Sequence, residues 1–256
     1  MISVKLKGRL GNQMWQYAVT RTIAETNGFD FALDGNFLGK TLFDCDLGQE
    51  FNPAAVRHRF KEPYNQAYIP KLLAIRDGTE LNGFFQCENY IRNNKQNVLN
   101  WFRFKEDYSD LGDVEGIIQF RGTDYKKGFY GGAFYLPKSY YDFCLDKIKK
   151  LYGNIRYTVI TEDVPAAKKR FPQFEVPQLS EGPQQFLLRN AKHLIISNSS
   201  FGWWGAWLNE KAKTIICPKF WLRYNQGDYW WPRNVCGKEF LNVDKQGRFS
   251  DAKMFL

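Results

Sequence analysis

The first 34 residues carry the pattern that most restricts how this chain can fold. Residues 2–7 have the apolar character of a strand, and a turn containing two glycines follows at residues 8–13. Apolar side chains then recur with helical spacing to about Asn27, where Gly28 is suited to end a helix. Residues 29–34 alternate as a second strand. A strand, a helix and a strand in this order predict a parallel sheet of the α/β class.

The remainder of the chain suggests two halves. Residues 35–107 show no clean period, and we interpret them as loops and short helices. The α/β alternation returns from about residue 113, and we interpret the tail after Pro218 as irregular. Strands are predicted at 116–120, 156–161, 174–179, 193–197 and 214–217, and helices at 137–152, 164–171, 183–190 and 203–209. The simplest organisation is an N-terminal half at 1–110 and a C-terminal half at 111–256.

The charge favours an anionic partner. The 36 basic and 27 acidic residues give a net charge of +9, which fits a nucleotide-sugar, a phosphorylated glycan, a membrane surface or a nucleic acid. The basic residues are spread along the chain without a stripe or a nucleic-acid-binding motif, so we expect no nucleic-acid partner.

Cysteine and histidine usage argues against metal or disulfide stabilisation. The five cysteines are odd in number and form no C-x-x-C pair, and the two histidines are far apart. No stretch approaches the roughly 18 apolar residues needed to span a bilayer. A strand already begins at Ile2, so no signal peptide is expected. We therefore expect a cytoplasmic protein, with contact at the inner membrane surface left open.

Four polar segments follow predicted strands, which is where α/β sheets bind ligands. The first includes Gly11, Asn12 and Gln13 before a helix, whose free N–H groups attract anions. Its spacing is not G-x-G-x-x-G, so it is no dinucleotide fingerprint. In the second, Arg121 can grip a pyrophosphate, and Asp124 can orient that arginine or accept a proton. An exposed salt bridge in a turn explains this pair equally well.

The third and fourth segments are also open to two interpretations. Glu162 and Asp163 can pair with the N1 and N2 hydrogens of guanine, but a carboxylate before a helix is also a common cap. Residues 198–201 offer hydroxyls and N–H groups to phosphate oxygens at a helix start. Three tryptophans follow at 203–207, and they cannot all face one side of a helix. Core packing alone is therefore expected to be an incomplete account of them.

These segments, in this order, resemble the α-1,2-fucosyltransferase family. The start G-R-L-G-N-Q-M-W-Q-Y-A is close to the start of the family, which usually has phenylalanine in place of Trp15. Residues 198–208 resemble the family motif N-S-S-F-S-W-W-G-A-W-L, with Gly202 in place of serine, and residues 83–90 resemble G-Y-F-Q-S-E-x-Y. The central family motif H-x-R-R-G-D-Y is altered here, with Gln119 replacing histidine and Gly122 replacing the second arginine.

The resemblance implies a GT-B-like fold, with two Rossmann-like halves and a cleft between them. It implies transfer of L-fucose from GDP-fucose to a glycan hydroxyl, the 2-OH of a terminal galactose, with inversion at the anomeric carbon and no cofactor or metal. The acceptor would bind the first half and be lipid-linked or part of a polysaccharide, and GDP-fucose would bind the second half.

The resemblance and the residues together suggest a site. We expect Arg121, Asn198, Ser199, Ser200 and Phe201 to surround the pyrophosphate, Glu162 or Asp163 to read guanine, and Gly11, Asn12 and Gln13 to lie near the fucose. Asp124 and Glu88 are the candidates for a catalytic base. A transferase for another GDP-sugar or another fucose linkage remains a rival. The changes at Gln119 and Gly122 also leave open a non-catalytic nucleotide- or glycan-binding module.

Overall fold

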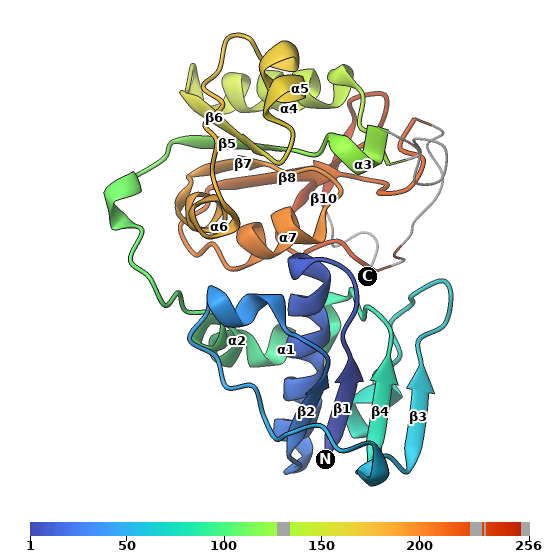
Figure 1. The fold of residues 1–256 in the computed structure, drawn as a ribbon. Coiled ribbons are helices and arrows are strands. Elements are labelled where there is room, and N and C mark those ends of the chain that lie inside the picture. The colour runs from blue at the N-terminus through green and yellow to red at the C-terminus, as the bar shows by residue number, and fades with distance from the viewer. Residues whose placement is uncertain (127–133, 226–231, 233, 252–256) are drawn as a thin grey trace. The chain divides into compact units, whose positions relative to one another are not determined.

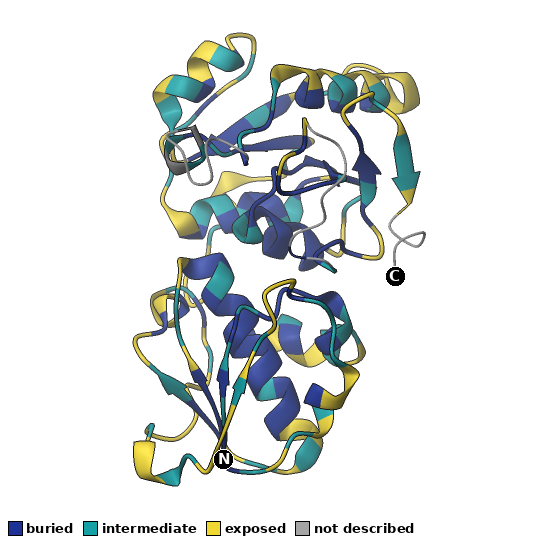
Figure 2. Cartoon of the chain, turned by 90° about the vertical axis from the view of Figure 1, so that its right-hand side faces the viewer, coloured by how far each residue is buried: buried dark blue, intermediate teal, exposed yellow. Residues whose placement is uncertain are grey.

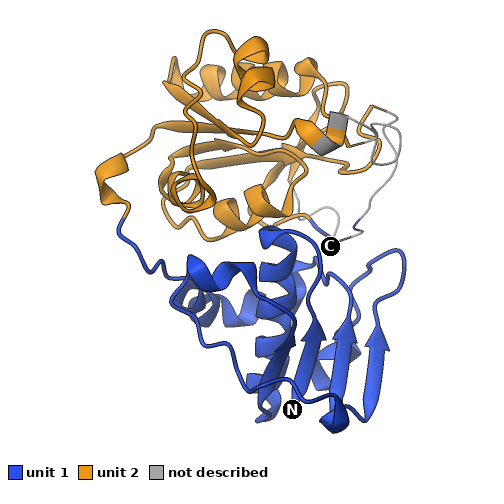
Figure 3. Ribbon diagram, viewed as in Figure 1, with its two compact units in different colours: residues 1–107, 232–235 blue, residues 108–231, 236–256 orange. Residues whose placement is uncertain are grey.

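The structure is a computed structural model, and it describes residues 1–126, 134–225, 232 and 234–251. It divides into two compact units (Figure 3). Unit 1 contains Met1–Asp107 and Pro232–Val235, and unit 2 contains Tyr108–Trp231 and Cys236–Leu256. The short segment at Pro232–Val235 therefore belongs to unit 1, although it lies within the predicted C-terminal half. Its Asn234 Oδ1 accepts a hydrogen bond from the backbone N–H of Tyr68, at 2.9 Å.

Unit 1 is built on a four-stranded parallel sheet in the order β2-β1-β4-β3 (Figure 1). Its elements are β1 (Ile2–Lys5), α1 (Leu10–Asn27), β2 (Phe31–Asp34), β3 (His58–Lys61), β4 (Thr79–Asn82) and α2 (Lys95–Trp101), with short 3₁₀ turns between them. Figure 2 shows that α1 is buried over most of its surface. The helix ends at Gly28, whose φ of 68° is the left-handed conformation that glycine adopts without strain.

The strands β3 and β4 were not predicted, and their side chains explain why. Three of the four residues of β3 are exposed, so this edge strand needs no run of apolar side chains. The other strand, β4, is only four residues long and mixes polar and apolar types. Neither segment has the periodicity from which a strand is recognised, and both are defined by pairing with a neighbouring strand instead.

Unit 2 contains a six-stranded sheet in the order β10-β9-β8-β7-β5-β6, parallel except for the last pair, β9 and β10. Figure 1 shows α4 and α5 over one face of this sheet and α6 and α7 over the other. The elements are β5 (Gly116–Phe120), α3 (Thr123–Lys126), α4 (Lys138–Tyr152), β6 (Tyr157–Thr161), α5 (Val164–Arg170), α6 (Glu181–Asn190), β7 (His193–Ile195), α7 (Ser200–Trp207), β8 (Thr214–Pro218), β9 (Leu241–Val243) and β10 (Phe249–Asp251).

The predicted α/β class is confirmed, in the GT-B-like form of two halves, with a parallel sheet in unit 1 and a largely parallel sheet in unit 2. A cleft between the halves stays a prediction. Two local predictions were wrong. Residues 174–179 form no strand and contribute only an isolated bridge between Glu175 and Thr158. The tail after Pro218 is not wholly irregular, because β9 and β10 extend the sheet.

The interpretation of the tryptophans was also wrong. Trp203 and Trp204 are fully buried and Trp207 is 5% exposed, so packing accounts for all three. The helix α7 is enclosed on several sides, because its Gly205 lets α6 approach closely. A Cβ at Gly205 would lie 2.4 Å from the Cβ of Leu188. A helix that is apolar all round is a buried helix, and its tryptophans need not share one side.

Candidate functional site

The strand order of unit 2 creates a position where ligands bind in open α/β sheets. From β5 the chain proceeds to β6 on one side, and then returns to β7 on the other side of β5. The connections therefore diverge at the carboxyl ends of β5 and β7, which is the place where open α/β sheets bind ligands. Arg121 follows β5 and residues 198–199 follow β7 shortly after its last residue. The tertiary structure thus brings two of the predicted segments to one switch point.

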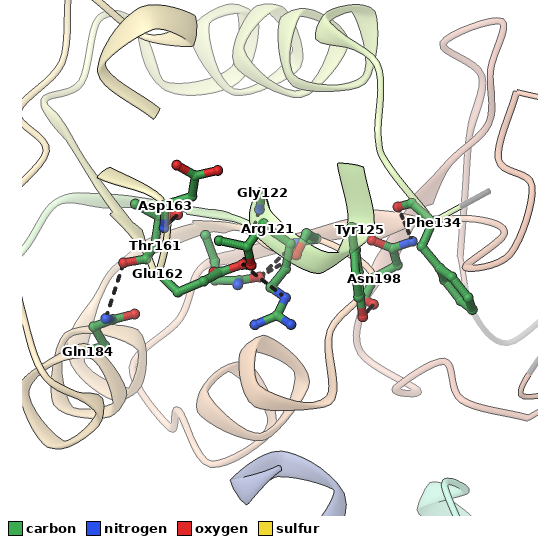
Figure 4. Close-up of polar contacts among 12 residues, drawn as sticks. Arg121, Gly122, Tyr125, Phe134, Thr161, Glu162, Asp163, Gln184 and Asn198 are labelled. Atoms are coloured by element: carbon green, nitrogen blue, oxygen red, sulfur yellow. Dashed lines mark hydrogen bonds and ion pairs between the residues drawn. The ribbon is translucent and has the colours of Figure 1, made fainter. Parts of the chain in front are cut away.

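Arg121 is held in place by its neighbours at this point (Figure 4). Its Nε lies 3.4 Å from Oε1 of Glu162, which follows the adjacent strand β6. Its guanidinium carbon lies 4.8 Å from the ring centroid of Tyr125. The side chain keeps 12% of its surface exposed. A guanidinium fixed by a carboxylate and an aromatic ring is preorganised to bind an oxyanion.

Glu162 organises the turn that carries this arginine. The same Oε1 atom accepts hydrogen bonds from the backbone N–H of Gly122, at 3.2 Å, and from Oγ1 of Thr123, at 3.1 Å. One carboxylate oxygen therefore contacts three consecutive residues after β5. The structure assigns Glu162 a contact with the Arg121 turn, and its predicted contact with guanine stays a prediction.

Asp163 has the cap role that the sequence left open. Its Oδ1 accepts a hydrogen bond from the backbone N–H of Ala166 at 3.2 Å, in the first turn of α5. The side chain also packs on Gly122, where an added Cβ would lie 2.4 Å from Oδ2 of Asp163 and 2.6 Å from its Cβ. There is consequently no room for the arginine that the family motif has at this position.

Asn198 serves the architecture of the site (Figure 4). Its Nδ2 donates to the backbone oxygens of Phe134, at 2.8 Å, and Trp221, at 2.6 Å. Its own backbone oxygen accepts from the hydroxyl of Tyr125, at 3.0 Å. The side chain is buried, so both amide hydrogens are committed to the protein. Asn198 therefore joins three segments of unit 2 at the turn before α7.

The three other predicted residues of this turn lie at the start of α7. The cap position belongs to Ser199, which is buried, and Ser200 and Phe201 open the helix as half-buried residues. The backbone oxygen of Phe201 accepts a hydrogen bond from Nε2 of Gln185 in α6, at 2.8 Å. This contact ties the first turn of α7 to α6.

Unit 1 has a switch point of its own, between β1 and β4. The chain passes from β1 to β2 on one side, and β4 lies on the other side of β1. Here Oδ1 of Asn12 accepts from Nε2 of Gln86, at 2.7 Å, which links the first turn of α1 to the loop after β4. The neighbouring Gln13 accepts from the backbone N–H of Leu38 at 2.8 Å. Both Gln13 and Gly11 are buried, so unit 1 brings the first motif and the 83–90 segment together.

Sequence reasoning missed Glu62, which follows β3 at the same edge of this sheet. Its carboxylate accepts the backbone N–H groups of Phe84, at 2.7 Å, and Phe85, at 2.8 Å. It thereby holds the loop in which Phe85 has a φ of 56°, a conformation that non-glycine residues rarely adopt. Burial raises the pKa of Glu62 to about 6, against the opposing effects of these hydrogen bonds and of Lys7. No motif marks it, because only the fold places it beside the loop.

This pKa predicts a pH-dependent stability. The pKa of Glu62 in the folded protein exceeds its ordinary value of 4.5. Its contribution to the free energy of unfolding is therefore fully present below pH 4.5 and is lost as the pH rises through about 6. The loss is at most about 2 kcal/mol for such a shift. We expect the free energy of unfolding to fall less over this window in Glu62→Gln than in the wild type, as measured by urea titration. Parallel pH profiles of the two proteins would contradict the assignment. Glu50→Gln, at an exposed position, is the matched control.

The two candidate bases differ in what the structure describes. Glu88 is 6% exposed and forms an ion pair with Arg92, with Oε1 3.2 Å from Nε. The backbone of Asp124 belongs to α3, but its side chain is not among those that the structure describes. The assignment of either as a base stays a prediction.

The described part of the chain contains neither a group of side chains that could hold a metal ion nor a helix that could span a membrane. There, no three or more His, Cys, Asp or Glu side chains are placed to hold a metal ion. In the same residues, no helix is both long and apolar enough to cross a membrane.

Comparison with known proteins identifies relatives of this chain. The sequence model of the family described as Glycosyl transferase family 11 matches residues 80–226. Two curated relatives come from Escherichia coli. The O-antigen biosynthesis glycosyltransferase WbnK is 26% identical, over 86% of this chain and 94% of its own. An alpha-1,2-colitosyltransferase is 25% identical, over 96% of this chain and 99% of its own. The family match includes Arg121, Glu162 and Asn198.

A solved structure gives a weaker likeness. A mutant of Arabidopsis thaliana FUT1 in complex with GDP has a TM-score of 0.49 and 11% sequence identity, with 81% of this chain and 68% of that chain covered.

Proposed function

This chain belongs to glycosyl transferase family 11 and is a glycosyltransferase, and we propose that it moves L-fucose from GDP-fucose to the 2-OH of a terminal galactose in a glycan. The observation that carries the proposal is Arg121, held by Glu162 and Tyr125 at the switch point after β5. A fixed guanidinium there suits the diphosphate of a nucleotide-sugar. The resemblance to the α-1,2-fucosyltransferases is confirmed by the family match.

The proposed reaction is a displacement with inversion. The acceptor oxygen forms a bond to the anomeric carbon from the face opposite GDP, and the bond from that carbon to the phosphate oxygen breaks. Its electron pair leaves with GDP, and the hydroxyl proton passes to a base, for which Asp124 and Glu88 remain the candidates. Arg121 and the start of α7 at Ser200 offset the charge that develops on the departing diphosphate, so we propose that no metal is required.

A second donor is favoured by one relative. The alpha-1,2-colitosyltransferase of Escherichia coli is named for another sugar with the same linkage. GDP-colitose is therefore the rival donor to GDP-fucose. The name O-antigen biosynthesis glycosyltransferase, given to the other relative, supports a polysaccharide or its lipid-linked precursor as acceptor. We propose that the transfer takes place in the cytoplasm, at the inner membrane surface.

The deciding experiment is a GDP-release assay with each of the two donors, over a panel of β-galactoside acceptors, with and without EDTA. We expect acceptor-dependent release from GDP-fucose that EDTA does not change. Faster release of GDP from GDP-colitose would show that GDP-colitose, and not GDP-fucose, is the preferred donor. Binding of GDP-fucose without release to any acceptor would favour the non-catalytic binding module. A requirement for added divalent cation would overturn the metal-independent mechanism.

A further inference from the structure

Two of the departures from the family motifs meet in space. Gln119 replaces the histidine of the central motif, and Gly202 replaces a serine of the last motif, far away in the sequence. In the structure, a Cβ on Gly202 would lie 2.7 Å from Oε1 of Gln119 and 3.1 Å from its Cδ. Real Cβ atoms are not found closer than about 3.0 Å to another heavy atom. The glycine thus provides the space that the amide of Gln119 occupies.

The amide oxygen of Gln119 has a defined task in that space. It accepts hydrogen bonds from the backbone N–H of Ser197, at 3.1 Å, and from its Oγ, at 2.6 Å. Gln119 is 3% exposed and Ser197 is fully buried, so water cannot readily replace this acceptor. The contact joins the end of β5 to the turn between β7 and α7.

The position of Gln119 connects this contact to the site. Gln119 is the last residue but one of β5, and Arg121 is the first residue after this strand. Ser197 directly precedes Asn198 and the start of α7. The same amide therefore sets where the α7 turn lies relative to the strand that carries Arg121.

We propose that Gln119 and Gly202 form one positioning unit, which fixes the turn before α7 beside Arg121 and thereby raises the affinity for the diphosphate of the donor. The identity of that ligand rests on the proposed function, whereas the coupling between the two residues does not. A Cβ at 202 would lie 2.7 Å from Oε1 of Gln119, so the amide must shift and its hydrogen bonds to the buried N–H and hydroxyl of Ser197 are weakened. Removal of the Gln119 amide has the same consequence.

A double-mutant cycle tests the unit, with GDP as the probe. Gln119→Ala, Gly202→Ala and the double variant are compared by Tm and by calorimetric Kd for GDP. We expect each single change to weaken GDP binding about tenfold, as the loss of buried hydrogen bonds at the site implies. We expect the Kd of the double variant for GDP to lie within about threefold of the Kd of each single variant. Independent effects would instead multiply to a weakening of about a hundredfold. Gln173→Ala, at an exposed position, is the control.

A second test restores the two residues that the family motifs have at positions 119 and 202, which are histidine and serine. We expect Gly202→Ser to weaken GDP binding in the presence of Gln119, and Gln119→His together with Gly202→Ser to bind more tightly than Gly202→Ser alone. Additive changes in both Tm and Kd would overturn the unit. Coupling in Tm with an unchanged Kd would overturn its positioning role and leave only packing. A wild-type protein that does not bind GDP would overturn the proposed function and the positioning role with it, while the Tm cycle would still decide the coupling.

Discussion

Replacing Arg121 with alanine is expected to lower kcat/KM for transfer by about 10³-fold, while the fold remains intact. The guanidinium is the preorganised cation at the switch point of unit 2, where charge develops on the departing diphosphate. The side chain follows β5 rather than lying within the strand, and it contacts Glu162 and Tyr125. Steady-state kinetics give the loss, and circular dichroism with Tm gives the integrity of the fold.

Two further variants make this test specific. Arg121→Lys keeps the charge but loses the planar fork and its packing on Tyr125, so it should recover only a small part of the activity. Arg156→Ala removes an equal charge from an exposed position just before β6, at the opposite end of the strands from Arg121. It should keep wild-type kinetics. Near-wild-type transfer by Arg121→Ala would refute the proposed site.

The second large effect is expected from Asn198→Asp, which changes one NH₂ group to oxygen. Nδ2 of Asn198 donates to the backbone oxygens of Phe134 and Trp221. A carboxylate there would lose both hydrogen bonds and face two carbonyl oxygens in a buried position. The cost is about 3–5 kcal/mol, from the two lost bonds and the buried charge without a partner. Urea titration should show this loss in the free energy of unfolding, together with weakened donor binding.

Asn198→Ala separates the two parts of this effect. It removes the hydrogen bonds without adding a charge, so it should destabilise less than Asn198→Asp. Asn154→Asp makes the same chemical change at an exposed position and should be close to neutral. Equal stability of Asn198→Asp and the wild type would show that Asn198 does not tie the turn before α7 to Phe134 and Trp221.

The sequence determined the fold class, because the pattern within each strand and helix is local. Alternating apolar residues, a helix start or a glycine at a helix end act within a few positions, and this is why β5, α4, β6, α5 and β8 agree closely with their predicted ranges. The strands β3 and β9 were missed, because their existence depends on a partner strand rather than on a pattern of their own.

The candidate site likewise has features that the sequence determined and features that only the tertiary structure decided. The types of residues after the strands, such as Arg121 and Asn12, could be recognised in the chain. Strand order alone decided which of these turns meet at a switch point, and it brought Glu62 to a loop that no motif connects with it. Packing decided that Asp163 caps a helix and that Gln119 lies against Gly202. Contacts of this kind join residues that are far apart in sequence, so no local pattern encodes them, and only the folded chain determines which atoms share the space.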